Sequence, residues 1–255
     1  MLTLKTGDIS DLGVTFASDH PLYGQGEKIR LLQLNAWYQN EEIDSLVDWL
    51  EKNHQKVDII FMQEVEPDLK VKLDRLKPLF PYAINKKKDP WFGRAFLSKI
   101  PIEDHQVPFF KHLPIHHYDS RAHYLKVDLK TKAGRELTLF GIHAPSPISS
   151  RDWEKRNKVL LEIGQIIHEM PRKNKVLLGD FNITPYAFHY KDLLEKSGLQ
   201  QGLSQLDSFP SYLPSFLRVP LDHFLVSPDI FMIDRKSIGS LGSDHLPMIT
   251  TIQIF

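Results

Sequence analysis

The stretch Val176-Leu177-Leu178-Gly179-Asp180-Phe181-Asn182 largely determines the predicted fold, because an apolar run passes directly into polar side chains. A short apolar run predicts a buried strand, so the polar side chains lie where that strand ends. Three other apolar runs end in the same way, at Asn35, at Gln63-Glu64 and at His143. Strands that end in carboxylate, amide and imidazole groups bring those groups to one edge of a sheet. Because gathered carboxylates are costly unless they bind a cation or pair with a positive group, the pattern predicts a divalent-metal site.

The composition is that of an ordinary globular protein. Of the 255 residues, 42% are hydrophobic and 25% are charged, and the 32 basic residues equal the 32 acidic ones. Any attraction to nucleic acid or to an anionic membrane must therefore be local. The absence of cysteine excludes disulfides, thiolate zinc sites and cysteine nucleophiles.

Targeting signals give little information about the compartment. No run of about eighteen apolar residues predicts a membrane-spanning helix, and the first residues do not have the form of a signal peptide. We expect residues 1–27 to form an N-terminal arm and residues 28–255 to form one domain. The chain can equally be the soluble part of a longer, membrane-anchored protein, so the localisation stays open.

Strand-like runs alternate with amphipathic helices, which favours a mixed α/β domain with two packed sheets between layers of helices. One helix is expected to begin near Glu41 after an Asn40 N-cap, and a second to begin at Thr184-Pro185. The longest helix should run from a Ser150 N-cap to Pro171 and bury Trp153 in its apolar stripe. A further helix is expected at 68–76, and strands are expected at 29–34, 57–63, 94–98, 105–109, 121–129, 136–142, 176–178, 223–226 and 247–254.

Glu64 is the first metal-ligand candidate, because its carboxylate follows a buried run and Mg²⁺ prefers such hard oxygen ligands. An ordinary surface glutamate at a strand end is equally probable. Asp180 and Asn182 lie two residues apart, which at strand spacing puts both on one side of the chain. An aspartate there could orient or deprotonate water. The competing interpretation is a turn, because aspartate, asparagine and glycine favour turns.

Two histidines are candidates for the same site. His245 follows Asp244 near the C-terminus, and Asp222 is a suitable acceptor to orient its ring. His143 ends an apolar run and could protonate a leaving oxygen. Taken alone, the Asp244-His245 pair is more often a surface pair, and a lone histidine is more often structural.

A lysine run, Lys86-Lys87-Lys88, precedes Trp91-Phe92, a combination that single-strand binders use. A solvated turn followed by core aromatics is the favoured interpretation. Phosphate-binding glycine loops, zinc-protease motifs and nucleophile elbows are absent from the sequence.

In this order, the polar clusters resemble the endonuclease/exonuclease/phosphatase superfamily with the DNase I-like fold, from about Ile29 to the C-terminus. The stretches that carry the resemblance are Leu34-Asn35, Gln63-Glu64-Val65, Gly93 to Lys99, Ile142-His143, Gly179-Asp180-Phe181-Asn182, Leu221-Asp222-His223 and Gly242-Ser243-Asp244-His245. The region from His143 through the stretch Pro214–Pro228 is most similar to a poorly characterised bacterial branch, often membrane-anchored. The resemblance implies a four-layer α/β sandwich, with two mixed β-sheets flanked by helices, and Mg²⁺- or Mn²⁺-dependent phosphoester hydrolysis.

The resemblance also implies roles for individual residues. Glu64 would bind the metal with Asn35 beside it, and Asp244 would lie near the metal or the water. Asp180 would activate the attacking water, Asn182 would help to position it, and His245, oriented by Asp222, would stabilise the transition state. His143 matches the histidine of the DNase, inositol-phosphatase and sphingomyelinase branches, although Arg94 lies where an acidic partner is expected.

Three functions therefore compete. The first is a metal-dependent phosphodiesterase or nuclease that acts on nucleic acid, with no obligate protein partner. The second is a phospholipid or inositol-phosphate hydrolase, for which an apolar loop that contains Phe209, Tyr212, Leu213, Phe216 and Leu217 would make peripheral membrane contact. That loop is more often simply a cover for the core. The third is a catalytically silent binding module, which requires that a catalytic residue be missing.

Overall fold

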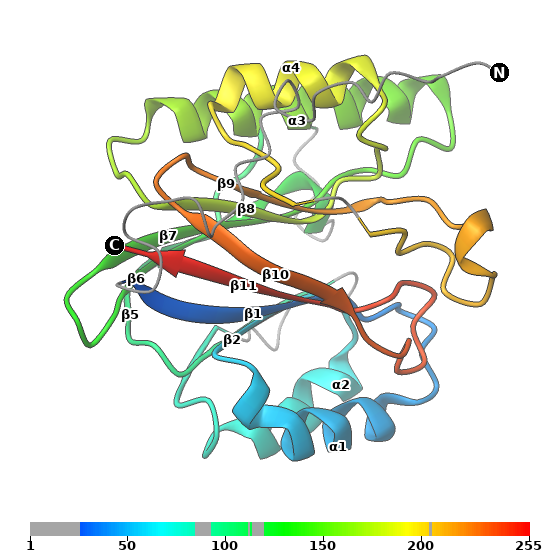
Figure 1. Cartoon of the computed structure of the whole chain (residues 1–255). Helices are drawn as coiled ribbons and strands as arrows, with labels where there is room; N and C mark the ends of the chain where they lie inside the picture. Colours follow the sequence, from blue (N-terminus) through cyan, green and yellow to red (C-terminus); the bar gives the residue numbers. More distant parts are fainter. Residues whose placement is uncertain (1–25, 85–92, 112, 114–119, 204–205) are drawn as a thin grey trace, which may run out of the picture.

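The computed structural model describes residues 26–84, 93–111, 113, 120–203 and 206–255. The predicted arm, apart from residues 26 and 27, and the Lys86–Phe92 segment lie outside the described residues. Two sheets pack face to face, and helices cover the outer face of each (Figure 1). The predicted four-layer α/β sandwich is therefore confirmed.

The six-stranded sheet has the order β10-β11-β1-β2-β4-β3. Its central strands β1 and β2 run parallel, and their neighbours on either side, β11 and β4, run antiparallel to them. The strands are β1 (Glu27–Asn35), β2 (Ile59–Val65), β3 (Tyr82–Ile84), β4 (Gly93–Ser98), β10 (Phe231–Ser237) and β11 (Met248–Ile254).

The five-stranded sheet has the order β5-β6-β7-β8-β9, and only its β7–β8 pair is parallel. In each sheet the parallel pair lies at or near the centre. The four strands of these pairs, β1, β2, β7 and β8, end in the polar residues described below. The strands are β5 (Ile102–Gln106), β6 (Tyr124–Lys130), β7 (Glu136–His143), β8 (Lys175–Asp180) and β9 (Asp222–Val226).

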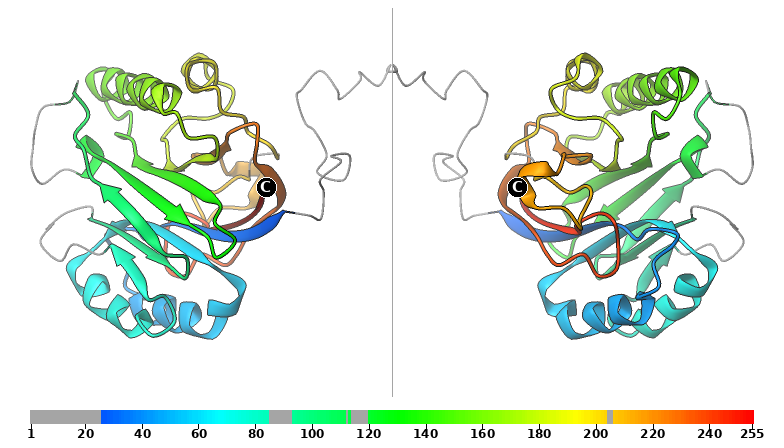
Figure 2. Two further views of the ribbon diagram at one scale, coloured as in Figure 1. Left: turned by 90° about the vertical axis from the view of Figure 1, so that its left-hand side faces the viewer. Right: turned by 90° about the vertical axis from the view of Figure 1, so that its right-hand side faces the viewer.

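The helices form the two outer layers. Helices α1 (Ile43–Asn53) and α2 (Pro67–Lys72) cover the six-stranded sheet, and α3 (Ser150–Glu169) and α4 (Phe188–Ser197) cover the other (Figures 1 and 2). Each outer layer has its own apolar core, and a third core fills the space between the sheets. Gly141 is required in that central core, because a Cβ there would lie 2.4 Å from the Phe61 ring. Within the described residues, no helix is both long and apolar enough to cross a membrane.

Several local predictions were wrong. The strand expected at 105–109 is β5 at Ile102–Gln106, and the strand expected from residue 121 begins only at Tyr124, after the short helix Ser120–Ala122. Asn40 does not cap α1, since the helix begins at Ile43 with Glu42 at its N-cap. Ser149, not Ser150, caps α3, because its Oγ accepts from the Asp152 N–H at 3.2 Å. Trp153 is 46% exposed rather than buried. Residues 184–187 form a turn, and α4 begins only at Phe188.

Candidate active site

The polar ends of strands from both sheets meet at one place. Asn35 ends β1 and Glu64 is the penultimate residue of β2, while His143 and Asp180 end β7 and β8. Asp222 begins β9 directly opposite Asp180 in the antiparallel register. All of these residues except Glu64, which is half-buried, are buried. The predicted convergence of polar side chains at one sheet edge is thus present in the structure.

Gln63 joins the two sheets beneath this edge. Its side chain is fully buried, its Nε2 donates to the Ile142 carbonyl at 2.6 Å, and its Oε1 accepts from the Asp180 N–H at 3.1 Å. One amide on β2 therefore fixes the strands that carry His143 and Asp180. In the sequence, Gln63 was identified only as part of the Gln63-Glu64 motif. Its position next to Glu64 did not predict a contact with the other sheet.

The backbone turns sharply where the functional side chains leave the sheets. Glu64 has a φ of 54° at a bulge between Gln63 and Val65, and Asn182 has a φ of 51°. The Asn182 N–H donates to Asp180 Oδ1 at 2.9 Å, which makes the turn that was the competing interpretation of this motif. The same turn directs the Asn182 amide at Asp180 Oδ2, at 3.2 Å. Here the turn is the means by which both side chains reach the site.

Asn35 lies between two carboxylates. Its Nδ2 donates to Glu64 Oε1 at 3.0 Å and to Asp180 Oδ2 at 3.4 Å, and its Oδ1 accepts from the Trp37 N–H. Glu64 Oε2 in turn accepts from the Tyr38 N–H at 3.2 Å. In this arrangement the Asn35 amide spaces the carboxylates, and its oxygen is directed away from them.

His245 is held by a buried aspartate. Its Nδ1 lies 2.6 Å from Asp222 Oδ2, its ring packs 4.8 Å from the Phe209 ring, and its Nε2 lies 3.8 Å from Asp180 Oδ2. Ser243 fixes the loop before it, because its Oγ donates to the Asn35 carbonyl and accepts from the His245 N–H. His245 therefore faces Asp180 with its free ring edge.

The electrostatics favour a charged His245. Burial alone would lower the pKa of His245, but the charge and hydrogen bond of Asp222, helped by Asp180 and Asp244, raise it to about 10. Burial would raise the pKa of Asp222, yet its contacts with His245 and Ser208 bring it below the usual value. At neutral pH the pair is an imidazolium with a carboxylate.

The remaining carboxylates repel one another. Burial raises the pKa of Asp180 to about 7, and the charges of Asp222 and Glu64 raise it further. The charge of His245 and the hydrogen bond from the Asn182 N–H act in the opposite direction and lower it. Burial, Glu64 and Asp222 likewise raise the pKa of Asp244. Asp244 Oδ1 is buried and has no hydrogen-bond partner among the described residues. These carboxylates would be stabilised by a cation at Glu64 and Asp244, although no three acidic or histidine side chains within the described ranges form a preassembled metal cluster.

The electrostatics of His143 favour a neutral ring. Its Nε2 lies 3.5 Å from Glu64 Oε1 and 3.7 Å from Asp180 Oδ2. Burial nevertheless lowers its pKa to about 4. The Glu64 carboxylate acts to raise this pKa, and the charges of Arg121 and Arg94 offset part of that effect. A neutral imidazole at pH 7 does not protonate a leaving oxygen, so the predicted acid role of His143 is not supported by the electrostatics.

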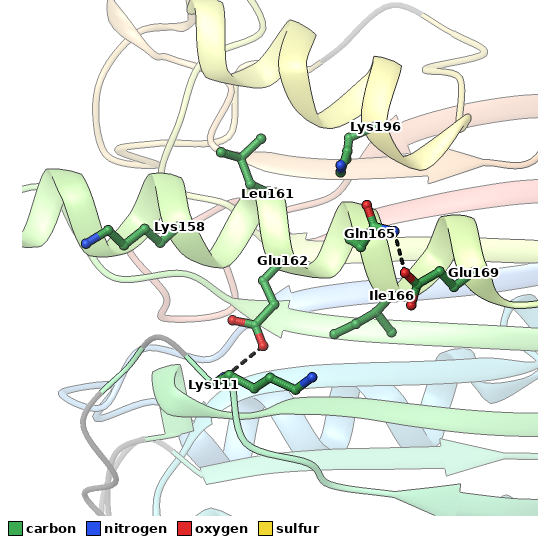
Figure 3. A pocket seen from close by; sticks show the side chains of 8 residues that line it. All are labelled: Lys111, Lys158, Leu161, Glu162, Gln165, Ile166, Glu169 and Lys196. Carbon is green, nitrogen blue, oxygen red and sulfur yellow. Dashed lines mark hydrogen bonds between the residues drawn. The ribbon is translucent and has the colours of Figure 1, made fainter.

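A groove on the outer helical layer lies apart from this site. It runs along α3 and is lined by Lys111, Lys158 and Lys196, together with apolar, amide and acidic side chains of α3 (Figure 3). Glu162 closes one side by accepting from the Lys111 N–H at 2.7 Å. None of the residues at the strand ends lines it, so the groove has no part in the chemistry proposed below.

Comparisons with known proteins agree with this architecture. Residues 32–245 match the family model described as "Endonuclease/Exonuclease/phosphatase family". No curated protein matches the chain significantly by sequence.

Three solved structures illustrate the likeness. An endonuclease/exonuclease/phosphatase from Bacteroides vulgatus has a TM-score of 0.73 at 17% identity, and the match covers 90% of this chain and 100% of that protein's chain. A Staphylococcus aureus beta toxin mutant with bound magnesium ions has a TM-score of 0.67 at 15% identity, and the match covers 88% of this chain and 99% of the toxin chain. TDP2 of D. rerio complexed with single-strand DNA product has a TM-score of 0.68 at 16% identity, and the match covers 89% of this chain and 99% of the TDP2 chain. At such identities the likeness establishes a shared fold.

Proposed function

Because the chain belongs to the endonuclease/exonuclease/phosphatase family, whose members are metal-dependent phosphoester hydrolases, we propose that residues 28–255 form a phosphodiesterase that acts on nucleic acid. The observation that carries the proposal is the convergence of an Asp222–His245 pair, Asp180 and the Glu64 carboxylate at one sheet edge. The reaction is an in-line attack of water on a phosphodiester.

Asp180 is the group that activates the water. It is rigidly held by the Gln63 and Asn182 contacts, and its pKa of about 7 lets it accept a proton near neutral pH. Asn182, whose Nδ2 also donates to the Ala144 carbonyl at 2.9 Å, helps to position the water and a phosphate oxygen.

His245 stabilises the charge that develops on the phosphoryl oxygens. An imidazolium fixed by Asp222 is already oriented, so it costs little reorganisation during the reaction. The same ring can release a proton to the leaving oxygen. His143 is neutral and instead donates a hydrogen bond to a phosphate oxygen.

Glu64 and Asp244 would hold Mg²⁺ or Mn²⁺, with Asn35 as a further oxygen ligand if its amide rotates. A small number of carboxylate ligands suits Mg²⁺, which keeps several waters. When bound, the ion would neutralise charge on the phosphate and help to template the attack. The unpartnered Asp244 Oδ1 and the mutual repulsion of the carboxylates support this assignment.

A lipid substrate is the second candidate, because one observation favours it. In the loop that follows Ser208, Tyr212 is 77% exposed, Phe216 82% and Leu217 54%, so these three side chains do not cover the core. Phe209 and Leu213 of the same loop are half-buried, and the Phe209 ring packs against His245. The loop is tied to the site through Ser211, whose N–H donates to the Asp244 carbonyl at 2.7 Å. An inositol phosphate would need no such apolar contact. A silent binding module is disfavoured, because every residue of the proposed machinery is present.

A substrate panel tests the proposal. Purified protein with Mg²⁺ is given single-stranded DNA, plasmid DNA, RNA, sphingomyelin vesicles and inositol phosphates, with Asp180→Asn as the inactive control. We expect cleavage of at least one nucleic acid that Asp180→Asn loses. Cleavage confined to vesicles would favour the lipid candidate, and binding without any cleavage would favour the silent module.

A further inference from the structure

The site edge continues past His143 onto the neighbouring strands β4 and β6. Arg94 lies on β4 opposite Gln63 of β2, and its Nη2 donates to the His123 carbonyl at 2.9 Å. His123 directly precedes Tyr124, which pairs with Ile142. This contact places the guanidinium group beside the end of β7, where His143 lies.

Arg121 approaches the same place from the turn before β6. It belongs to the short helix η5 (Ser120–Ala122), and the Ala122 carbonyl that follows accepts from the Phe110 N–H at 2.8 Å. Its charge acts both on His143 and on Asp152 in the first turn of α3. The η5 turn contacts β7, and the chain enters β6 where Tyr124 pairs with Ile142, so the backbone of Arg121 lies past the carboxyl end of β7.

The charges along this edge change sign in order. Asp222 and Asp180 lie on β9 and β8 with the charged His245 between them, Glu64 and His143 come next, and Arg94 follows toward β6. Neighbouring strands are about 4.8 Å apart, and Arg94 is hydrogen-bonded to the backbone just before β6, the strand next to β7. A guanidinium fork matches phosphate oxygens in shape and in charge, whereas the rest of the site is acidic.

We propose that Arg94 and Arg121 form a subsite for a second phosphate, so that the enzyme prefers a phosphodiester that has a phosphorylated neighbour, as in a polynucleotide. The inference rests on the proposed function and adds the recognition of the adjoining nucleotide. A zwitterionic headgroup such as phosphocholine offers no second phosphate and would gain nothing from these residues.

Ligand binding tests the subsite without requiring turnover. Isothermal titration calorimetry with Mg²⁺ compares thymidine 3′,5′-bisphosphate with the 3′- and 5′-monophosphates and with phosphocholine. We expect the bisphosphate to bind about tenfold more tightly than either monophosphate, as one charge-assisted contact allows. Arg94→Gln and Arg121→Gln should each remove most of that advantage and leave monophosphate and phosphocholine binding unchanged. Inositol 1,4-bisphosphate is a separate arm, and a stronger gain with it would assign the second phosphate to an inositol ring.

Arg135→Gln is the matched control, since Arg135 lies beside the opposite end of β7 and faces Glu27. Arg94 also holds the His123 carbonyl, so Arg121→Gln provides an independent variant if Arg94→Gln folds poorly. Equal affinity of wild-type protein for mono- and bisphosphates would overturn the subsite, as would a bisphosphate advantage that survives both substitutions. If binding follows the expectation but no dinucleotide is cleaved, the subsite stands and the proposed hydrolysis fails.

Discussion

The Nδ1 atom of His245 lies 2.6 Å from Oδ2 of Asp222, and both side chains are buried. Gln33 Nε2 approaches the other oxygen of Asp222 at 3.4 Å. The two residues lie on different segments, one in the loop before β11 and one at the start of β9. Their contact therefore links the two sheets and fixes the protonated ring toward Asp180.

This contact predicts that Asp222 and His245 act as one unit. Asp222→Asn and His245→Ala should each slow turnover by about 10²- to 10³-fold, the usual cost of losing a transition-state donor. The double variant should be little slower than the poorer single variant. Single-turnover rates of the four proteins test the coupling, and fully additive losses in log rate would show that the residues act separately.

The charge state of His245 can be measured directly. With a pKa of about 10, the ring should not titrate between pH 6 and 8 in an NMR experiment, whereas in Asp222→Asn its pKa should fall into that range. Protonation of His245 stabilises the fold fully below its ordinary pKa near 6.5, and this stabilisation is lost as the pH rises through 10. The exposed His168 serves as an internal control, because its resonance should be the same in both proteins. A neutral-range titration of His245 in the wild type would contradict the assignment.

Asp180→Asn should lower turnover by about 10³-fold or more, because it removes the base and keeps the shape. In metal-free protein the wild-type carboxylate costs stability once it ionises, since its pKa is raised to about 7. That cost is absent below the ordinary pKa near 4 and complete above 7. The melting temperature of the variant relative to wild type should therefore rise between pH 4 and pH 8.

The pH trend is the informative part of this measurement. The side-chain amide that Asp180→Asn introduces would face the Asn35 and Asn182 donors, which offsets some of the gain at every pH. A difference in melting temperature that does not change with pH would show that folding does not raise the pKa of Asp180. A near-normal rate would remove Asp180 from the mechanism.

Gln63→Ala should destabilise the protein by about 2–5 kcal/mol, because it leaves a cavity and two buried backbone groups without partners. Those groups are the Ile142 carbonyl and the Asp180 N–H. The control is Gln165→Ala on the surface of α3, which should change the unfolding free energy by less than about 0.5 kcal/mol. Urea denaturation compares the variants, and equal midpoints would exclude a bridging role for Gln63.

The fold was predictable from the sequence because its buried strands are apolar runs that end in polar residues. Val176–Leu178 and the run before Glu64 are such cases. The structure lengthens the first to Lys175–Asp180 and moves the second from 57–63 to Ile59–Val65. Strand β10 was missed because it is an edge strand with charged residues such as Asp234, Arg235 and Lys236. Thr184-Pro185 carries helix-start residues, but the chain makes a turn there first.

The site was only partly predictable. Strand ends identified Glu64, His143 and Asp180, and the Asp222 contact with His245 was expected from residue chemistry. Contacts across the two sheets depend on how the sheets pack, so the sequence did not indicate the bridging role of Gln63. The resemblance placed Arg94 in the neighbourhood of His143, but not its hydrogen bond to the His123 carbonyl. The neutral state of His143 depends on complete burial, which spacing alone does not reveal.

The most direct test of the account is metal-dependent hydrolysis of bis(p-nitrophenyl) phosphate by metal-stripped protein. We predict no turnover in EDTA, recovery when Mg²⁺ or Mn²⁺ is restored, and a much higher metal requirement in Glu64→Gln, because that change removes the principal charged ligand. Undiminished turnover in EDTA, with removal of the metal confirmed by elemental analysis, would contradict the proposed chemistry.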